Sequence, residues 1–295
     1  MSVSVARSVL KLHSSSQKSS SSTSPVYPSN PDVVLKKLPF YILDEVLLRP
    51  SSLQPTTTTG TKKLHEQTFK FSLSPGQVRK VMGTRSTVRG RVEYRQQVQL
   101  RLSLLETTAE QPDNFPKSLC VKVNSKVCSL PNPLPSQPGT EPRRPPGPLN
   151  ITNLVKLSTP STNTLTINWA TEPNKAFTVS VYTVEALTHR DLLDQLEAKG
   201  VRNPDYTRAL IKEKLNDQDS EIATTSCKVS LACPLGKNRM RIPARASTCD
   251  HLQCFDAQTY LMMNERKPKW NCPVCNKTAE PVSLQIDGFF QDLVK

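Results

Sequence analysis

The chain has 295 residues, enough for one or two domains, and 36% of them are hydrophobic, which allows a sizeable core. Its net charge of +14 favours acidic partners such as nucleic acid, an anionic membrane or an acidic protein face, and fits a solvated basic surface equally well. No run approaches the roughly 18 apolar residues of a membrane span, so no membrane partner is expected. Without the apolar core of a secretory signal, the eight cysteines are expected in a reducing compartment, where clustered cysteines more often bind metal than form disulfides.

Residues 1–30 form a low-complexity, Ser-rich stretch. It carries Arg7, Lys11 and Lys18 and has no acidic residue before Asp32, which loosely fits a mitochondrial transit peptide. A serine tract has little apolar surface to bury, so a disordered basic tail is the favoured interpretation.

Residues 31–188 are predicted to form a β domain. Short runs alternate polar and apolar residues with a period of two, which is typical of half-buried strands. Several such strands, broken by Pro and Asn, predict an antiparallel β-sandwich or barrel. The proline-rich segment 131–150 cannot be a central strand and is expected to be a long loop or a hinge. The strand-like runs are 69–73, 88–106, 118–123, 164–170 and 176–187.

Residues 189–224 are predicted to form a helical linker. A first helix spans 189–200 and stops at Gly200. A second helix begins after Asn203, with Pro204 at its first position and Asp205 near the positive end of its dipole. The expected buried stripes are Leu192, Leu193 and Leu196 in the first helix and Leu210, Ile211 and Leu215 in the second.

Residues 225–295 contain a cluster of metal-binding residue types. Cys249, His251 and Cys254 lie close together, and Cys272-x-x-Cys275 follows later. Zinc prefers four such ligands in a tetrahedron, and a C-x-x-C pair presents two thiolates from one turn. A catalytic Cys–His pair would need a base and an oriented third group, and nothing in the sequence indicates one. A structural zinc site is therefore favoured.

This pattern can be compared with a RING finger, which binds two zinc ions through alternating sets of four ligands. One set can be completed, and it consists of Cys249, His251, Cys272 and Cys275. The other contains only Cys233 and Cys254, because Gly236 and a residue near Ala257 stand where the remaining ligands belong. We predict a small RING-like domain with one zinc ion, whose second corner, around Cys233 and Cys254, is held by packing and hydrogen bonds. No internal repeat is evident.

Trp270 stands just ahead of Cys272. A tryptophan on a zinc loop can belong to the core or can be an exposed anchor for a partner, and its position alone favours the core. Between the two halves of the cluster, Asp256 is expected to cap a short helix. The apolar residues Tyr260, Leu261 and Met263 of this helix are expected in the core.

The segment 229–277 closely resembles the SP-RING, or MIZ, zinc finger of the PIAS/Siz family of SUMO-protein ligases. Upstream, Pro148–Thr152 resembles the motif that names the PINIT domain of that family, with Leu149 in place of Ile. Segments 199–215 and 219–226 resemble the linker between the two domains. The resemblance covers roughly residues 37–295 and implies an α+β multidomain chain: an antiparallel β-sandwich-like PINIT domain (31–188), a helical linker (189–224) and a single-zinc finger with a C-terminal segment (225–295).

The resemblance implies an activity as well. Members of the family transfer SUMO from a thioester on the SUMO-conjugating enzyme to a substrate lysine, and they contribute no nucleophile. The zinc ligands implied are the same four residues. By analogy with RING folds, the conjugating enzyme is expected to dock on Leu235, Trp270 and Pro273, which favours a binding role for Trp270. The PINIT-like domain is expected to select substrates such as transcription factors, and the protein is expected in the nucleus.

The sequence departs from the family pattern in two ways. Many relatives have a cysteine in place of Ala244, a position outside the ligand set. Neither the SAP domain that binds DNA nor the acidic tail that binds SUMO is seen, so DNA binding is not expected. The alternatives are a ubiquitin ligase, disfavoured by the incomplete second zinc site and the upstream domain, and a nuclear zinc-finger adaptor that regulates transcription without transferring SUMO.

Overall fold

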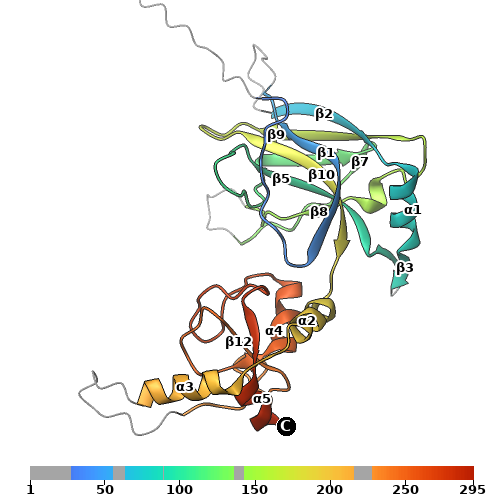
Figure 1. Ribbon diagram of the computed structural model, residues 1–295. Coiled ribbons are helices and arrows are strands. Elements are labelled where there is room, and N and C mark those ends of the chain that lie inside the picture. The colour runs from blue at the N-terminus through green and yellow to red at the C-terminus, as the bar shows by residue number, and fades with distance from the viewer. Residues whose placement is uncertain (1–27, 56–63, 89, 136–142, 216–227) are drawn as a thin grey trace, which may run out of the picture.

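The computed structural model describes residues 28–55, 64–88, 90–135, 143–215 and 228–295, and these form two lobes (Figure 1). The first lobe consists mainly of β-strands. The second lobe contains four helices around a small sheet, and it holds the C-terminus (Figure 1). The predicted serine-rich tail and segment 219–226 lie outside the described residues, apart from the last few residues of the tail. No helix among the described residues is long and apolar enough to cross a membrane.

The first lobe is a sandwich of two four-stranded antiparallel sheets, which confirms the predicted fold class. Apolar residues from both sheets, such as Val98, Val181 and Ile167, are fully buried in one shared core. The first sheet has the order β1 (Tyr41–Ser52), β10 (Phe177–Ala186), β5 (Gln96–Leu104), β8 (Leu149–Asn150). The second has the order β2 (Leu64–Ser72), β9 (Thr162–Ala170), β6 (Lys117–Val123), β7 (Lys126–Val127).

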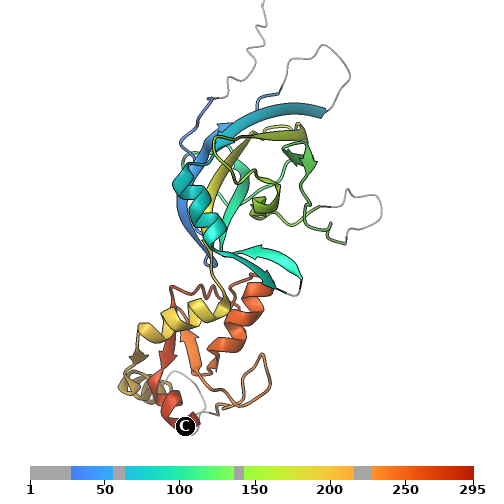
Figure 2. The same cartoon turned by 90° about the vertical axis from the view of Figure 1, so that its right-hand side faces the viewer.

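The run 88–106, predicted as one strand, is divided in the structure. Its first part belongs to a separate hairpin of β3 (Arg85–Val88) and β4 (Arg91–Tyr94), and only the part from Gln96 onward enters the main sheet as β5. The chain reverses at Gly90, whose φ of +78° is readily available only to glycine. The hairpin extends from the sandwich toward the second lobe (Figure 2).

Helix α1 (Pro75–Gly83) interrupts the β lobe and was not expected from the sequence. Ser74 caps it by accepting a hydrogen bond from the backbone of Gln77, whose side chain accepts one from the backbone of Ser74. This capping box, with proline at the first helical position, was a readable signal for a helix start. A 3-10 turn, η1 (Thr152–Leu154), follows β8.

The second lobe begins with the predicted linker helices. Helix α2 (His189–Ala198) buries Leu192, Leu193 and Leu196 as expected. Helix α3 (Pro204–Leu215) differs from expectation, because its one buried residue is Thr207 and Leu215 is 38% exposed. Helix α3 packs mainly on α5 (Gly288–Val294), so its last turn extends beyond the body of the lobe.

A four-stranded sheet forms the centre of the second lobe. Its order is β11 (Val201–Arg202), β14 (Leu284–Asp287), β12 (Pro243–Ala246), β13 (Phe255–Asp256), and only the first pair is parallel. Helix α4 (Ala257–Arg266) follows β13 and packs on α2. Asp256 caps α4 as predicted, with its side chain accepting from Thr259 N. Tyr260 and Leu261 are in the core, whereas Met263 is 49% exposed and its predicted burial was wrong.

Candidate metal centre

The structure brings together the four predicted ligands. The ligand atoms of Cys249, His251, Cys272 and Cys275 all lie within 4.8 Å of one another. The Sγ atoms of Cys249 and Cys275 are 3.7 Å apart, too far for a disulfide and close to the separation of about 3.8 Å that two Zn–S bonds of about 2.3 Å give in a tetrahedron. The four residues therefore fit one zinc ion.

The ring orientation of His251 suits a metal ligand. Its Nδ1 lies 2.9 Å from the carbonyl oxygen of Gln253, which favours the tautomer that carries the proton on Nδ1. Nε2 then has a free lone pair and faces the Sγ of Cys272, 3.2 Å away. Burial lowers the pKa of His251, so the imidazole stays neutral and available to a metal.

The thiol of Cys249, unlike the imidazole of His251, tends to keep its proton. Burial, followed by the neighbouring thiols of Cys275 and Cys272, raises the pKa of Cys249 to about 12 in the metal-free protein. A buried thiolate without a counter-ion is unfavourable, and Zn²⁺ supplies the charge that stabilises it.

Zinc affinity is expected to rise with pH for this reason. At neutral pH the metal must displace the proton of Cys249, and each proton released changes the apparent affinity about tenfold per pH unit. Affinity is gained as pH rises and lost as it falls. Competition with a chromogenic chelator at several pH values, corrected for protonation of the chelator, measures this slope. An affinity that does not change with pH would mean that the thiols are already ionised without the metal.

The second corner lies apart from this cluster. Cys233 and Cys254 are both buried, and burial raises the pKa of Cys254 well above its usual value. The Sγ of Cys233 accepts hydrogen bonds from the backbone N–H groups of Gly236 and Asp256, at 3.5 and 3.3 Å. Backbone donors thus occupy the surroundings of a sulfur that a metal would hold in a complete RING.

The turns that follow Cys233 and Cys272 have the same hydrogen bonds. In each, the N–H of the cysteine donates to a carbonyl five residues later at 2.8 Å, and its carbonyl accepts from the N–H four residues later at 2.9 Å. Lys237 and Asn276 stand at equivalent places with φ of +60° and +62°. No internal repeat is evident in the sequence, yet Cys-Pro opens both turns, and Gly236 stands where the second turn has the metal ligand Cys275.

A buried ion pair lies behind the metal cluster. Arg245 on β12 bonds to Asp287 at 2.7 Å, and the two side chains are 4% and 2% exposed. Arg245 also donates to the carbonyl of His251, and Asp287 accepts from the hydroxyl of Thr207 on α3 and from Phe290 N in α5. This network connects a predicted ligand to the linker helix and the C-terminal helix, and it was not expected from the sequence.

The predicted docking residues differ in exposure. Leu235 and Pro273 are half-buried on the two matching turns. Trp270 is only 8% exposed and packs between Phe40 and Tyr260, with ring centroids 5.4 and 6.2 Å away. Its position is that of a core residue, which does not fit the docking role predicted for it. A groove beside α4 contains none of the three; its lining includes Gly236, Arg239, Arg241, Thr259, Met262 and Lys295.

Other apolar residues near the two turns are more exposed than Trp270. Val274, next to Pro273, is 41% exposed, and Met262 and Met263 on α4 are 37% and 49% exposed. The sequence placed Met263 in the core and singled out neither Val274 nor Met262. The exposure of Met262 and Met263 depends on which face of α4 packs on α2, which local sequence does not reveal.

Comparison with known proteins adds to this geometry. Residues 32–185 match the PINIT domain, and residues 229–278 match the MIZ/SP-RING zinc finger. The chain is 52% identical over 273 residues to E3 SUMO-protein ligase PIAS2 of Homo sapiens, covering 92% of this chain and 44% of that protein. It is 50% identical over 270 residues to E3 SUMO-protein ligase PIAS3 of Homo sapiens, covering 90% of this chain and 42% of that protein. The chain thus spans less than half the length of these relatives.

Among solved structures, the S. cerevisiae SUMO E3 ligase SIZ1 superposes with a TM-score of 0.68, at 24% identity, over 90% of this chain and 87% of that one. At this identity the similarity concerns the fold. It extends over both lobes, so the arrangement of a β-sandwich followed by a RING-like lobe is shared.

Proposed function

Because the chain belongs to the PIAS/Siz family, we propose that it acts as a SUMO-protein ligase that positions a SUMO-charged conjugating enzyme for transfer to a substrate lysine. The observation that carries this proposal is the complete four-ligand zinc cluster on a RING-like lobe that directly follows a PINIT sandwich. The relatives named as E3 SUMO-protein ligases, PIAS2 and PIAS3, align with 92% and 90% of this chain, a span that takes in residues of both parts.

The proposed ligase supplies no nucleophile. Of the seven described cysteines, three belong to the zinc cluster, and Cys128, Cys233 and Cys254 are buried. Burial raises the pKa of the Cys128 thiol, which makes it a poor nucleophile. The remaining one, Cys120, lies on β6 of the sandwich, away from the zinc lobe. Rate enhancement then comes from orientation: holding two reactants in a productive geometry can contribute several kcal/mol, up to about 7–11 in favourable cases.

Zinc serves this reaction by fixing the docking surface. Cys249, His251, Cys272 and Cys275 would hold the ion, and it would keep the turn around Pro273 next to the loop that carries Cys249 and His251. We assign the contact with the conjugating enzyme to Leu235 and Pro273, and we add Val274 and Met262 because of their exposure. Trp270 is left out of this surface because it is buried.

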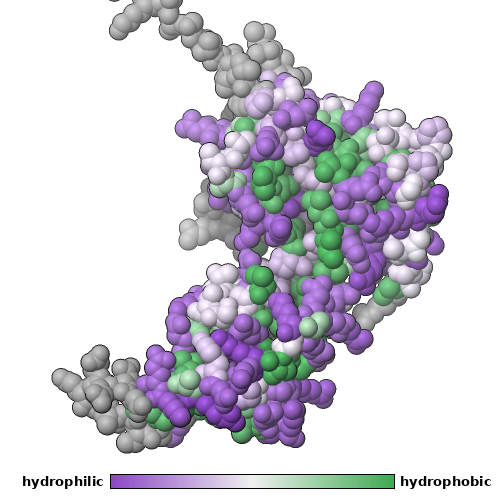
Figure 3. Space-filling view, viewed as in Figure 1, coloured by the Kyte–Doolittle hydropathy of each residue, from purple (hydrophilic) through white to green (hydrophobic). Residues whose placement is uncertain are grey.

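Substrate selection is assigned to the PINIT lobe. Strand β1 lies at the edge of its sheet and exposes Ile42, Leu43 and Val46, and an apolar band crosses this lobe in Figure 3. The β3–β4 hairpin adds the exposed cations Arg85 and Arg91. A substrate with an apolar segment beside acidic residues would complement both. Transcription factors as substrates and nuclear localisation are parts of this proposal.

Leu235→Ala is expected to slow discharge of the charged conjugating enzyme onto free lysine by about tenfold, because an apolar contact at the centre of an interface is worth about 1–2 kcal/mol. The assay contains SUMO, its activating and conjugating enzymes and this chain, and it follows the loss of the thioester. Leu64→Ala, which removes a 57% exposed leucine on the sandwich, outside the proposed docking surface, is the control.

Equal discharge rates for Leu235→Ala and the unaltered chain would remove Leu235 from the docking surface. If the unaltered chain itself does not accelerate discharge while it binds zinc, the adaptor alternative is favoured. An adaptor would keep its binding partners when Leu235 is replaced.

A further inference from the structure

Phe40 connects the two lobes. It directly precedes β1 of the sandwich, yet its side chain is 8% exposed within the core of the zinc lobe rather than the sandwich core. Its ring lies 5.4 Å from that of Trp270. Its carbonyl accepts a hydrogen bond from Leu187 N at 2.8 Å, so the segment before β1 is tied to the chain that leaves β10 for the second lobe.

The backbone of Trp270 is held in an uncommon conformation to present its ring. Its φ is +52°, which costs a non-glycine residue of order 1 kcal/mol or more. Asn264, buried in α4, accepts from the N–H groups of Trp270 and Lys269, both at 2.9 Å, and Ala279 N donates to the carbonyl of Trp270 at 2.7 Å. The surroundings thus fix Trp270 on both sides, and Phe40 covers its face.

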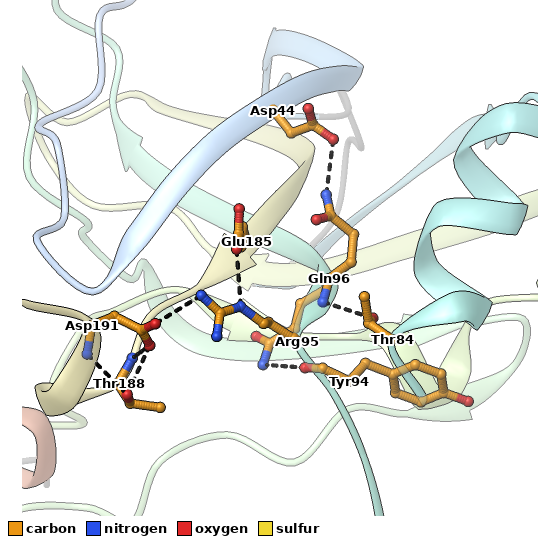
Figure 4. Close-up of polar contacts among 9 residues, drawn as sticks. Asp44, Thr84, Tyr94, Arg95, Gln96, Glu185, Thr188 and Asp191 are labelled. Atoms are coloured by element: carbon orange, nitrogen blue, oxygen red, sulfur yellow. Dashed lines mark hydrogen bonds and ion pairs between the residues drawn. The ribbon is translucent and has the colours of Figure 1, made fainter. Parts of the chain in front are cut away.

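Ion pairs also connect the two lobes. Lys36 bonds to Glu280 at 3.0 Å, which links the segment before Phe40 to the zinc lobe. Arg95, at the base of the β3–β4 hairpin, bonds to Glu185 on β10 and to Asp191 on α2, both at 2.9 Å (Figure 4). Asp191 also accepts from the backbone and hydroxyl of Thr188.

These ion pairs are largely exposed, and such pairs contribute about 0–1 kcal/mol each. Most of the stabilisation therefore comes from burying Phe40 against Trp270, since burial of a phenylalanine contributes about 1.5–3 kcal/mol. The pairs Lys36–Glu280 and Arg95–Asp191 add further contacts between the lobes, which restrict rotation of one lobe against the other. Two lobes joined only by a flexible linker would have neither a buried aromatic contact nor ion pairs between them.

We propose that Phe40 and Trp270 form a rigid joint that holds the PINIT sandwich and the zinc finger in one fixed orientation. Phe40 is then a positioning residue. Trp270 was predicted from sequence to contact the conjugating enzyme, and in this proposal it binds the ring of Phe40 instead. For activity the inference rests on the proposed ligase function: a substrate on the sandwich would be kept at a constant position relative to the thioester docked on the finger.

The test compares rotational tumbling of the two lobes by ¹⁵N relaxation in the full chain, with and without Phe40→Ala. The unaltered chain is expected to give one correlation time for both lobes. In Phe40→Ala the lobes are expected to tumble separately, with the correlation time of each reduced to about half, since each lobe is about half the mass. Zinc content should stay at one ion per chain in both.

Phe71→Ala is the matched control, because Phe71 is equally buried but lies wholly within the sandwich core. It should lower stability and keep one common correlation time. Phe40→Leu covers the case in which Phe40→Ala unfolds the zinc lobe: it keeps apolar volume, loses the ring contact and is expected to give partial uncoupling. Separate tumbling in the unaltered chain, or common tumbling in both Phe40 variants, would overturn the proposal.

Activity gives a second readout. The residues assigned to docking all lie in the zinc lobe, so Phe40→Ala is expected to leave the rate of discharge onto free lysine unchanged. Conjugation to lysines of the sandwich itself, mapped by mass spectrometry, should spread over more sites. An unchanged site pattern in a chain whose lobes have uncoupled would contradict the positioning role. If the chain has no ligase activity, the tumbling measurement still tests whether the joint is rigid. Failure of the proposed function and failure of the joint are therefore distinguishable.

Discussion

Replacing Cys272 by Ser is expected to abolish zinc binding and unfold the second lobe while the sandwich stays folded. Cys272 is buried, belongs to the four-ligand cluster and forms part of the apolar core of the lobe. Structural zinc contributes an apparent binding free energy of about 10–16 kcal/mol in small zinc modules, and the loss of one ligand sacrifices a large part of it. Metal analysis of the purified chain and the dispersion of its NMR amide signals measure both effects.

Cys120→Ser is the control for this experiment. Cys120 is partly buried on β6 of the sandwich and lies outside the metal cluster, so zinc content should remain one ion per chain. In the conjugation assay, Cys272→Ser should fall to the rate without ligase, and Cys120→Ser should match the unaltered chain. Retention of both zinc and a folded second lobe by Cys272→Ser would show that the ligand set is wrong.

Asp287→Ala is expected to destabilise the zinc lobe by about 3–5 kcal/mol, because it leaves the guanidinium of Arg245 buried without its counter-charge. It also removes the cap of α5 and the acceptor for Thr207. The effect should appear as a lower denaturant midpoint for the zinc lobe, followed with the metal kept in excess. Since Arg245 also holds the His251 carbonyl, zinc affinity should weaken in parallel.

Two variants make this measurement specific. Asp292→Ala removes an exposed aspartate of the same helix, which pairs with Lys295, and should change stability by less than about 0.5 kcal/mol. The double change Arg245→Met with Asp287→Leu replaces the pair by apolar side chains and should recover much of the loss. If Asp287→Ala were no more destabilising than Asp292→Ala, the buried pair would not hold the lobe together.

The parts of this molecule that depend on short spacing could be predicted from sequence. The zinc ligands follow from their spacing, and the starts of α3 and α4 follow from Pro204 and Asp256. Period-two runs indicated the sandwich. These features are decided within a few residues by ligand geometry, capping and side-chain alternation, so distant contacts do not alter them.

Features that depend on distant contacts could not be predicted. Trp270 is buried because Phe40, far away in the sequence, covers it. Arg245 can be buried because Asp287 pairs with it. Leu215 is exposed because α3 extends beyond α5, the helix on which it packs. In each case the burial or exposure of the side chain depends on which distant part of the chain packs against it.

The matching turns at Cys233 and Cys272 bear on how this lobe responds to metal supply. The first turn keeps its shape through backbone hydrogen bonds to the sulfur of Cys233, and only the second belongs to the metal cluster that the described residues form. A two-ion cross-brace can be half-loaded and so respond to zinc in steps. With one ion, occupancy follows a simple saturation curve, and the lobe passes directly between an empty and a loaded form. Zinc scarcity would then lower the number of competent molecules without creating a partly active species.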